Sequence, residues 1–250
     1  MSSTVEVRRL ATPQDLFRAA ADEVLHAAAG AIEKRGRFTI ALSGGSTPRS
    51  LYSLIAANAA ASVPWDKVFF FWGDERHVGP NDPQSNYRMA EESLFSKVSV
   101  PANNIFRVPS ENPDAAAAAD DYEQTMRKFF ETPPGEFPRF DMILLGMGPD
   151  GHTASLFPET AALQEKTRWV VANWVEKLQT RRITLTLPVL NRARLVAFLI
   201  SGTDKAAALH EVLEGKGPGE KYPSKLVQPS DGKLIWFVDR AASSELSTAA

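Results

Sequence analysis

Short runs of consecutive apolar residues recur along the 250-residue chain and are separated by longer segments of mixed polarity. Several of these runs are apolar throughout, which is typical of strands that are covered on both faces of a parallel sheet. The predicted strands are Phe38 to Leu42, Val68 to Trp72, Met142 to Leu145, Ile183 to Leu187, Leu195 to Ile200 and Leu234 to Val238.

The segments between the runs have the periodicity of amphipathic helices. In the first segment, Thr12 and Pro13 offer an N-cap and a first-turn proline, and apolar residues repeat every four positions from Leu16 to Ile32. Strands that alternate with helices predict an α/β fold with a mostly parallel central sheet flanked by helices. The length fits a single domain over residues 1–250. The remaining predicted helices are Arg49 to Ala61, Asp114 to Phe130 and Lys205 to Leu213.

Three of the predicted strands end in a glycine accompanied by polar residues, and these loops carry most of the candidate chemistry. They follow the strands that end at Leu42, Trp72 and Leu145. Ligands of open α/β sheets bind beyond the carboxyl ends of the strands. We therefore expect the three loops to converge on one crevice.

The first loop, Ser43-Gly44-Gly45-Ser46-Thr47-Pro48, has the composition of an anion site. Its glycines let backbone N–H groups approach a ligand, its hydroxyls add donors, and Pro48 suits the first turn of a helix whose dipole then faces the loop. A phosphate is the most plausible anion. The loop matches neither the Walker A pattern nor GxGxxG. The alternative is a plain glycine-rich turn with a threonine cap.

The second loop carries a dense charge cluster, Asp74-Glu75-Arg76-His77, directly after an apolar strand. The permanently charged fork of Arg76 suits contact with a carbonyl or a carboxylate. The alternative is an internal salt bridge between Arg76 and Asp74 or Glu75, and one of these carboxylates could orient Arg76 while it binds a ligand. His77 is a weaker candidate.

The third loop places His152 among the glycines of Gly146 to Gly151, beside Asp150. Histidine titrates near neutrality and can act as a general base, and Asp150 is near enough in sequence to orient it. The alternative is a surface histidine without function. No other histidine stands at the helical spacing of a two-histidine metal site with His152, so we predict no metal.

Two further cations are candidate phosphate ligands. Lys205 lies at the start of a predicted helix, where a cation is unfavourable to the helix dipole unless an anion sits between them. Arg182, just before Ile183, is a second possible anion contact, but its neighbour Arg181 leaves the assignment open. The alternative for Lys205 is a solvated side chain.

Composition excludes several classes of function. The chain has 28 Lys and Arg against 30 Asp and Glu, a net charge of −2, which gives no overall attraction to nucleic acid or anionic membranes. It contains no cysteine, so disulfides and thiol catalysis are excluded. No apolar run approaches the length of a membrane span and the first residues do not resemble a signal peptide, so we expect a cytoplasmic protein.

Together, these elements resemble the 6-phosphogluconolactonase family over most of the chain. The resemblance implies a modified Rossmann-like fold related to glucosamine-6-phosphate deaminase, ribose-5-phosphate isomerase and CoA transferase. It also implies hydrolysis of 6-phospho-D-glucono-1,5-lactone to 6-phospho-D-gluconate, the second step of the oxidative pentose phosphate pathway, without metal or organic cofactor. The matching stretches are Ala41 to Tyr52, Phe71 to Val78 with Asn86-Tyr87, Asp141 to Pro158, and Ile183 to Leu209.

Site roles follow from the resemblance by position. His152, assisted by Asp150, corresponds to the general base, and Arg76 to the residue near the lactone carbonyl. The family segment before Ile183 is often proline-rich, whereas here it reads Glu176-Lys177-Leu178-Gln179-Thr180-Arg181, which leaves open which side chain between Lys177 and Arg182 meets the substrate. The implied substrate and phosphate ligands are Ser43, Gly44, Gly45, Ser46, Thr47, Asp74, Gly151, Arg182 and Lys205.

Two alternatives remain. A deaminase or isomerase of the same superfamily would have a glutamate five residues after the histidine of the third loop, where this chain has Phe157, and Asp-Glu-Tyr where it has Asp74-Glu75-Arg76. A sugar-phosphate sensor would usually carry a DNA-binding segment, and no basic helix is visible. Both comparisons favour the lactonase, and the sequence leaves the oligomeric state open.

Overall fold

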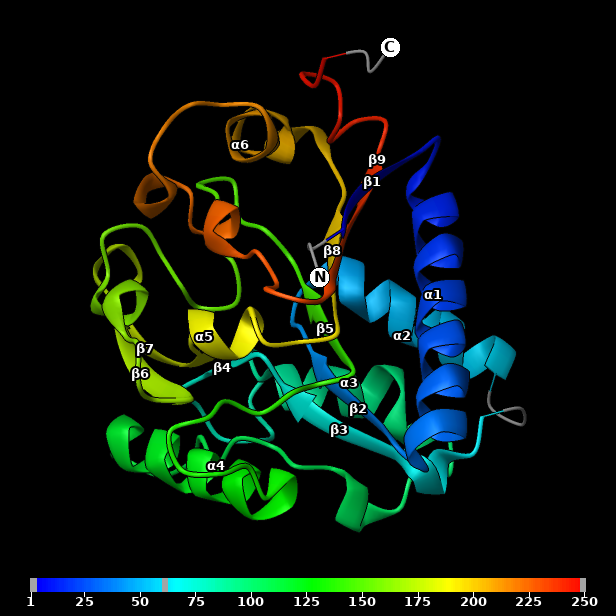
Figure 1. Cartoon of the computed structure of the whole chain (residues 1–250), viewed down its shortest axis with the longest axis vertical. Helices are drawn as coiled ribbons and strands as arrows, with labels where there is room; N and C mark the ends of the chain where they lie inside the picture. Colours follow the sequence, from blue (N-terminus) through cyan, green and yellow to red (C-terminus); the bar gives the residue numbers. More distant parts are fainter. Residues whose placement is uncertain (1–3, 60–62, 248–250) are drawn as a thin grey trace.

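The central feature of the fold is a six-stranded parallel sheet. The structure, a computed structural model, describes residues 4–59 and 63–247 (Figure 1). The strand order is β1-β9-β8-β5-β2-β3, and every neighbouring pair is parallel. This arrangement confirms the predicted α/β class with a mostly parallel sheet. The strands are β1 (Thr4–Leu10), β2 (Phe38–Leu42), β3 (Val68–Trp72), β5 (Met142–Leu145), β8 (Leu195–Ile200) and β9 (Lys233–Asp239).

A second, three-stranded antiparallel sheet lies beside the first. It consists of β4 (Asp74–Arg76), β7 (Thr180–Leu185) and β6 (Val170–Val175), in the order β4-β7-β6. The prediction of a strand from Ile183 to Leu187 is wrong in its bounds, because the observed strand ends at Leu185. It also belongs to this antiparallel sheet, since β4 follows β3 after only Gly73 and gives β7 a partner outside the central sheet.

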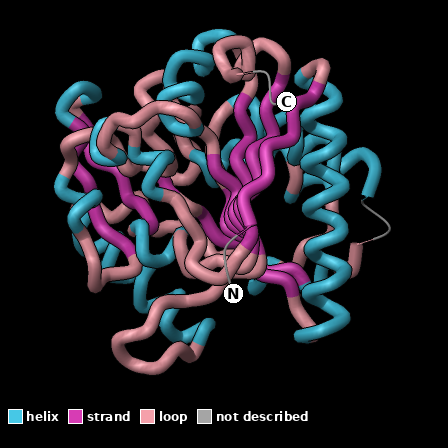
Figure 2. Tube along the Cα trace, turned by 45° about the horizontal axis from the view of Figure 1, so that its top comes forward, coloured by secondary structure: helices cyan, strands magenta, loops and turns pink. Residues whose placement is uncertain are grey.

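Helices cover both faces of the central sheet, as Figures 1 and 2 show for the long α1 on one side and for the layer that contains the small sheet on the other. Helix α2 begins three residues before the predicted start at Arg49, and the predicted end at Ala61 falls outside the described residues. None of the described helices is both long and apolar enough to cross a membrane. The helices are α1 (Pro13–Arg35), α2 (Ser46–Ala59), α3 (Asn86–Ser93), α4 (Ala115–Phe130), α5 (Leu187–Leu190) and α6 (Ala206–Leu213).

The boundaries of α1 follow the sequence signals. The Thr12 hydroxyl accepts the N–H of Asp15 at 3.1 Å, and Gly36 ends the helix in the left-handed conformation with φ of 74°. Leu16, Ala20 and Val24 are buried, as the four-residue spacing predicts.

Elements without a continuous apolar run escaped prediction. Strand β1 reads TVEVRRL and alternates between exposed and half-buried residues, whereas β3 at the other edge of the sheet is almost fully buried. Strand β6 and helix α3 were likewise not predicted. Helix α3 has eight residues, and its cap is Ser85, whose hydroxyl accepts the Arg88 N–H at 3.2 Å.

Two buried tyrosines hold the carboxyl ends of the strands next to the predicted crevice. The Tyr52 hydroxyl accepts the N–H of Ser43 and donates to the C=O of the same residue, both at 2.9 Å. The Tyr122 hydroxyl does the same at Trp72, at 2.8 Å to N and 3.2 Å to O. Each hydroxyl thereby satisfies two buried backbone groups of one residue, which keeps the strand end and the loop after it in place.

We predict that Tyr52→Phe lowers the free energy of unfolding by roughly 1–3 kcal/mol, because it leaves two buried backbone groups of Ser43 without a partner. Urea denaturation monitored by circular dichroism measures the change. Tyr87→Phe is the control, since its half-exposed side chain keeps its ring packing. Equal effects of the two substitutions would show that the Tyr52 hydroxyl does not hold the strand end.

Candidate active site

A cavity of about 280 Å³ opens at the carboxyl edge of the central sheet. The loops that follow β2, β3, β5 and β8 form its wall, so the predicted convergence of the polar loops is correct. The wall contains nine of the twelve predicted site residues, and it does not include Asp150, Gly151 or Arg182. The nine are Ser43, Gly44, Gly45, Ser46, Thr47, Asp74, Arg76, His152 and Lys205.

The first loop presents the start of a long helix to this cavity. Helix α2 begins at Ser46, within the loop, and runs for 14 residues. Gly45 has φ of 107°, a conformation that side chains rarely adopt, and its C=O accepts the first helical bond from Arg49 N at 3.1 Å. The first N–H groups of a helix lack intrahelical acceptors, so the positive end of α2 and two hydroxyl groups face the cavity together.

Asn86 connects the first two loops, and the residue patterns gave it no role. Its amide donates to the Asp74 C=O at 2.9 Å, and a Cβ at Gly44 would lie only 1.9 Å from its Oδ1. The absence of a side chain at Gly44 therefore admits Asn86, which also lines the cavity. Its position at the start of α3 was not visible because α3 itself was not predicted.

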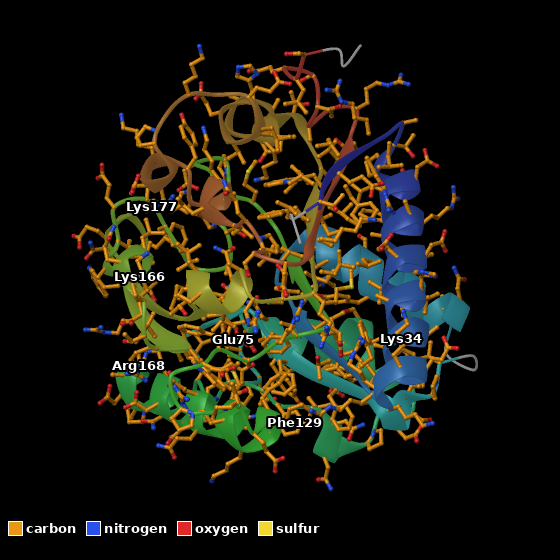
Figure 3. All side chains as sticks on the ribbon, viewed as in Figure 1. Lys34, Glu75, Phe129, Lys166, Arg168 and Lys177 are labelled. Atoms are coloured by element: carbon orange, nitrogen blue, oxygen red, sulfur yellow. The ribbon has the colours of Figure 1, made fainter. Side chains whose placement is uncertain are left out.

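Glu75 does not form the salt bridge with Arg76 that one interpretation of the charge cluster suggested. Its side chain, labelled in Figure 3, is buried and accepts the backbone N–H groups of Arg76, Asn86 and Tyr87 at 2.7–2.8 Å and the Ser85 hydroxyl at 3.1 Å. Burial raises its pKa, and the three N–H donors oppose the shift. Glu75 thus fixes the start of α3 to β4.

Arg76 is free to face the cavity because neither neighbouring carboxylate pairs with it in the described part of the chain. Its guanidinium donates to the Gln84 C=O. Asp74 is also buried, and it accepts the Ser155 hydroxyl at 2.6 Å. Opposite Arg76 in the antiparallel sheet stands Arg182, whose pKa is lowered by burial and by the charge of Arg76.

His152 is held on three sides. Its Nδ1 lies 2.5 Å from Asp150 Oδ1, which confirms the predicted contact of the two residues, and its ring stacks on Phe157 with centroids 3.9 Å apart. A Cβ at Gly148 would lie 2.1 Å from Nδ1 and Cε1, so only glycine leaves room for the imidazole. Because a carboxylate only accepts, Nδ1 carries the proton, and the lone pair is on Nε2.

The electrostatic surroundings keep His152 neutral. Burial, together with the charges of Lys205 and Arg182, lowers its pKa to about 4, and the charge of Asp74 acts in the opposite direction. A histidine with a lowered pKa is uncharged at neutral pH, so its Nε2 is available to accept a proton.

Lys205 also lines the cavity, at the end of a 3₁₀ turn, Thr203–Lys205, directly before α6. Its ammonium group pairs with the exposed Asp204 at 2.8 Å. The preceding turn is fixed by Asp239, whose carboxylate accepts the Ser201 hydroxyl at 2.5 Å and the Gly202 N–H at 3.2 Å. Lys205 therefore lies on a turn that Asp239 fixes, and its ion pair with the exposed Asp204 is weak.

Two other candidates, Gly151 and His77, do not line the cavity. Gly151, with φ of 75°, makes a turn whose C=O accepts the Ser224 N–H at 2.9 Å, and a Cβ there would lie 2.8 Å from the Tyr222 ring. His77 donates from Nε2 to the C=O of Asn112 at 2.7 Å. Among the described residues, no group of three or more His, Asp or Glu side chains is placed to hold a metal ion.

The fold and the cavity define an α/β protein in which a histidine paired with an aspartate, a lysine and the N-terminus of a helix meet at the same crevice. The family model of glucosamine-6-phosphate isomerases and 6-phosphogluconolactonases matches residues 11–236. The chain belongs to this family.

Relatives and solved structures agree with this membership. The 6-phosphogluconolactonase of a Nostoc species is 46% identical over 99% of this chain and 100% of its own. The 6-phosphogluconolactonases of Trypanosoma cruzi and Trypanosoma brucei superpose with TM-scores of 0.88 each, at 28% and 25% identity, and cover 99% and 98% of this chain and 99% and 100% of their own. A monomeric glucosamine-6-phosphate deaminase, 21% identical with a TM-score of 0.77 over 96% of this chain and 99% of its own, shares the fold.

We predict that Glu75→Gln lowers the free energy of unfolding by roughly 1–3 kcal/mol, because an NH₂ group then replaces an oxygen that accepts two of the four donors. Chemical denaturation measures the loss. Glu92→Gln is the matched control, as Glu92 is exposed and forms an ion pair with Arg88 along α3. If the two variants are equally stable, Glu75 does not fix α3 to β4.

Proposed function

We propose that this chain hydrolyses 6-phospho-D-glucono-1,5-lactone to 6-phospho-D-gluconate, the second step of the oxidative pentose phosphate pathway. The observation that carries the proposal is that His152, which is paired with Asp150, lines the same cavity as Lys205 and the start of α2. The first group can activate water and the second can hold a phosphate. The names of the relatives and of the structural neighbours support the same reaction.

The phosphate subsite is formed by the loop Ser43 to Thr47 and by Lys205. A helix N-terminus with free N–H groups favours an anion, and the ammonium of Lys205 adds a charge-assisted bond. The bound phosphate would also resolve the unfavourable position of Lys205 at the start of α6. Arg182, which is half-buried behind Arg76, contributes through its charge instead of lining the cavity.

The reaction then needs only water. Nε2 of His152 removes a proton from a water molecule, whose oxygen attacks C1 of the lactone, and Arg76 stabilises the oxyanion. When the tetrahedral intermediate collapses, the bond from C1 to the ring oxygen breaks. The imidazolium returns its proton to that oxygen, which becomes the C5 hydroxyl. Asp150 holds the ring and stabilises the imidazolium while it exists.

The structure favours this reaction over the deaminase chemistry of the same superfamily. The position five residues after His152 is occupied by Phe157, whose ring is stacked on the imidazole. No carboxylate can act from that position to assist sugar ring opening. Phe157 instead excludes water from one face of His152, which contributes to the burial that lowers its pKa.

We further propose that the chain works as one domain in the cytoplasm, without an organic cofactor and without a nucleic-acid partner. Ester hydrolysis requires no redox or group-transfer cofactor. The net charge of −2 and the absence of cysteine support the remaining points.

The direct test is lactone hydrolysis by the purified protein with freshly generated substrate, after subtraction of the spontaneous reaction. We expect much faster hydrolysis of the phosphorylated lactone than of glucono-1,5-lactone, and no release of ammonia from glucosamine 6-phosphate. Hydrolysis no faster than the background, or deamination in its place, would overturn the proposal.

We predict that His152→Ala lowers kcat by about 10²–10⁴-fold and changes KM much less, because it removes the general base. For the unmodified protein, kcat/KM, which reports the free enzyme, stays level from pH 7 to about 5 and falls towards pH 4, where His152 becomes protonated. Stopped-flow or coupled pH-indicator assays measure both effects.

Two controls separate this role of His152 from a structural one. His152→Asn is polar but does not accept a proton near neutral pH, and it should be as inactive as the alanine variant while it remains folded. His77→Ala should retain activity, since His77 bonds to a loop outside the cavity wall. A folded, active His152→Asn protein would contradict the assigned role.

We predict that Lys205→Ala raises KM for the phosphorylated lactone about 10- to 100-fold, the value of one charge-assisted hydrogen bond. Lys34→Ala is the control, since Lys34 lies at the far end of α1 (Figure 3). KM for the unphosphorylated lactone should stay the same in both variants. If KM for the phosphorylated substrate is also unchanged in the Lys205 variant, Lys205 is only a solvated lysine.

A further inference from the structure

The Asp150 carboxylate is shared between two partners that come from distant parts of the chain. Its Oδ1 accepts Nδ1 of His152 at 2.5 Å and the His152 backbone N–H at 3.2 Å. Its Oδ2 forms an ion pair with Lys177. Lys177, which is labelled in Figure 3, lies in the turn Glu176–Leu178 that joins β6 to β7.

A second contact connects the same three side chains. The Lys177 ammonium lies 4.9 Å from the centre of the Phe157 ring, and the His152 imidazole stacks on that ring at 3.9 Å. Lys177 is therefore attached to His152 by two routes, through the carboxylate and through the ring. Lys177 does not belong to the cavity wall, so it reaches His152 but not the space for the substrate.

The neighbours of Lys177 leave it free for this contact. The adjacent carboxylate of Glu176 accepts the Trp174 indole N–H at 2.6 Å and the Gln179 amide at 2.8 Å, which keeps it turned away from Lys177. Asp150 is the carboxylate with which Lys177 forms an ion pair.

We infer that Lys177 is a positioning residue for the proposed reaction, which fixes Asp150 against His152 and limits the negative charge that His152 experiences. This inference rests on the proposed function. The ammonium partly neutralises Asp150, so the carboxylate can orient the imidazole without forcing it into the protonated form. The small antiparallel sheet thereby acts on the reaction from two points of its β6–β7 hairpin, through Lys177 and through Arg182 opposite Arg76.

The electrostatics around His152 predict what the loss of Lys177 does. The charged groups that face His152 are Asp150 on its own loop, Asp74 of β4, Arg182 of β7 and Lys205 before α6. Without Lys177, Asp150 acts with its full charge, which favours the imidazolium. The pKa of His152 should therefore rise, and the acid limb of kcat/KM should move to higher pH.

The test uses Lys177→Met, which keeps the length of the side chain without its charge. We expect the pKa of His152 to rise by about 0.5–1 unit, the size of a partly screened charge interaction. We also expect kcat at neutral pH to fall several-fold, since Asp150 is less well held. Lys177→Arg should restore both values. NMR titration of the imidazole measures the pKa, and with four histidines in the chain the His152 signal is assigned by its loss in His152→Asn.

Arg181→Met is the matched control, because Arg181 lies on the same hairpin, is exposed and stacks over Trp174 at 5.8 Å. It removes the same charge without the contact to Asp150, so the titration of His152 and kcat should stay as they are. The inference is overturned if Lys177→Met leaves the His152 titration unmoved or lowers it, or if Arg181→Met shifts it equally. The NMR titration needs no substrate, so failure of this inference can be distinguished from failure of the proposed function in the lactone assay.

Discussion

Three backbone amides and one hydroxyl converge on the buried carboxylate of Glu75, and the geometry of the site depends on this interaction. It joins β4 to the start of α3. That connection places Asn86 against Gly44 and leaves Arg76 at the cavity wall. A buried carboxylate is costly unless several donors satisfy it, and two of the donors here, the N–H groups of Asn86 and Tyr87, are the first of a helix and lack intrahelical acceptors. The same interaction therefore satisfies the carboxylate and fixes the loop.

The cavity must meet two electrostatic requirements, and the residues that meet the first also affect the second. Phosphate binding requires cations, and a general base must be uncharged. In the proposed reaction Lys205 and Arg182 would meet the first requirement, and their charges lower the pKa of His152, which serves the second. A bound phosphate would partly neutralise these cations, so the basicity of His152 should increase when substrate is present. Asp150 then supplies the charge that stabilises the imidazolium during the reaction.

The sequence predicts the parts of the molecule that depend on local pattern. The uniformly apolar runs predict the central strands, and the glycine and polar residues after them predict the common edge where Ser46, Arg76 and His152 meet. The contact of Asp150 with His152 could be expected because only one residue separates them. These features need no information about distant partners.

The rest depends on contacts that sequence spacing does not encode. Glu75 could pair with Arg76 or accept backbone amides, and only the position of α3 decides between them. The strand around Ile183 looks like the others because its residues are buried, but its partner is β4, so it joins an antiparallel sheet. Lys177 lies 27 residues from Asp150, and only the β6–β7 hairpin brings them together. Strand β1 has a weak pattern because none of its residues is fully buried, unlike most of those of β3 at the other edge.

The most direct measurement is a crystal structure of the protein with bound 6-phospho-D-gluconate. The proposed reaction predicts the phosphate on the Ser43 to Thr47 loop and Lys205, and the C1 carboxylate beside Nε2 of His152 and the guanidinium of Arg76. A ligand bound in the reverse orientation, or one with C1 beyond hydrogen-bond reach of His152 and Arg76, would contradict this assignment of the site.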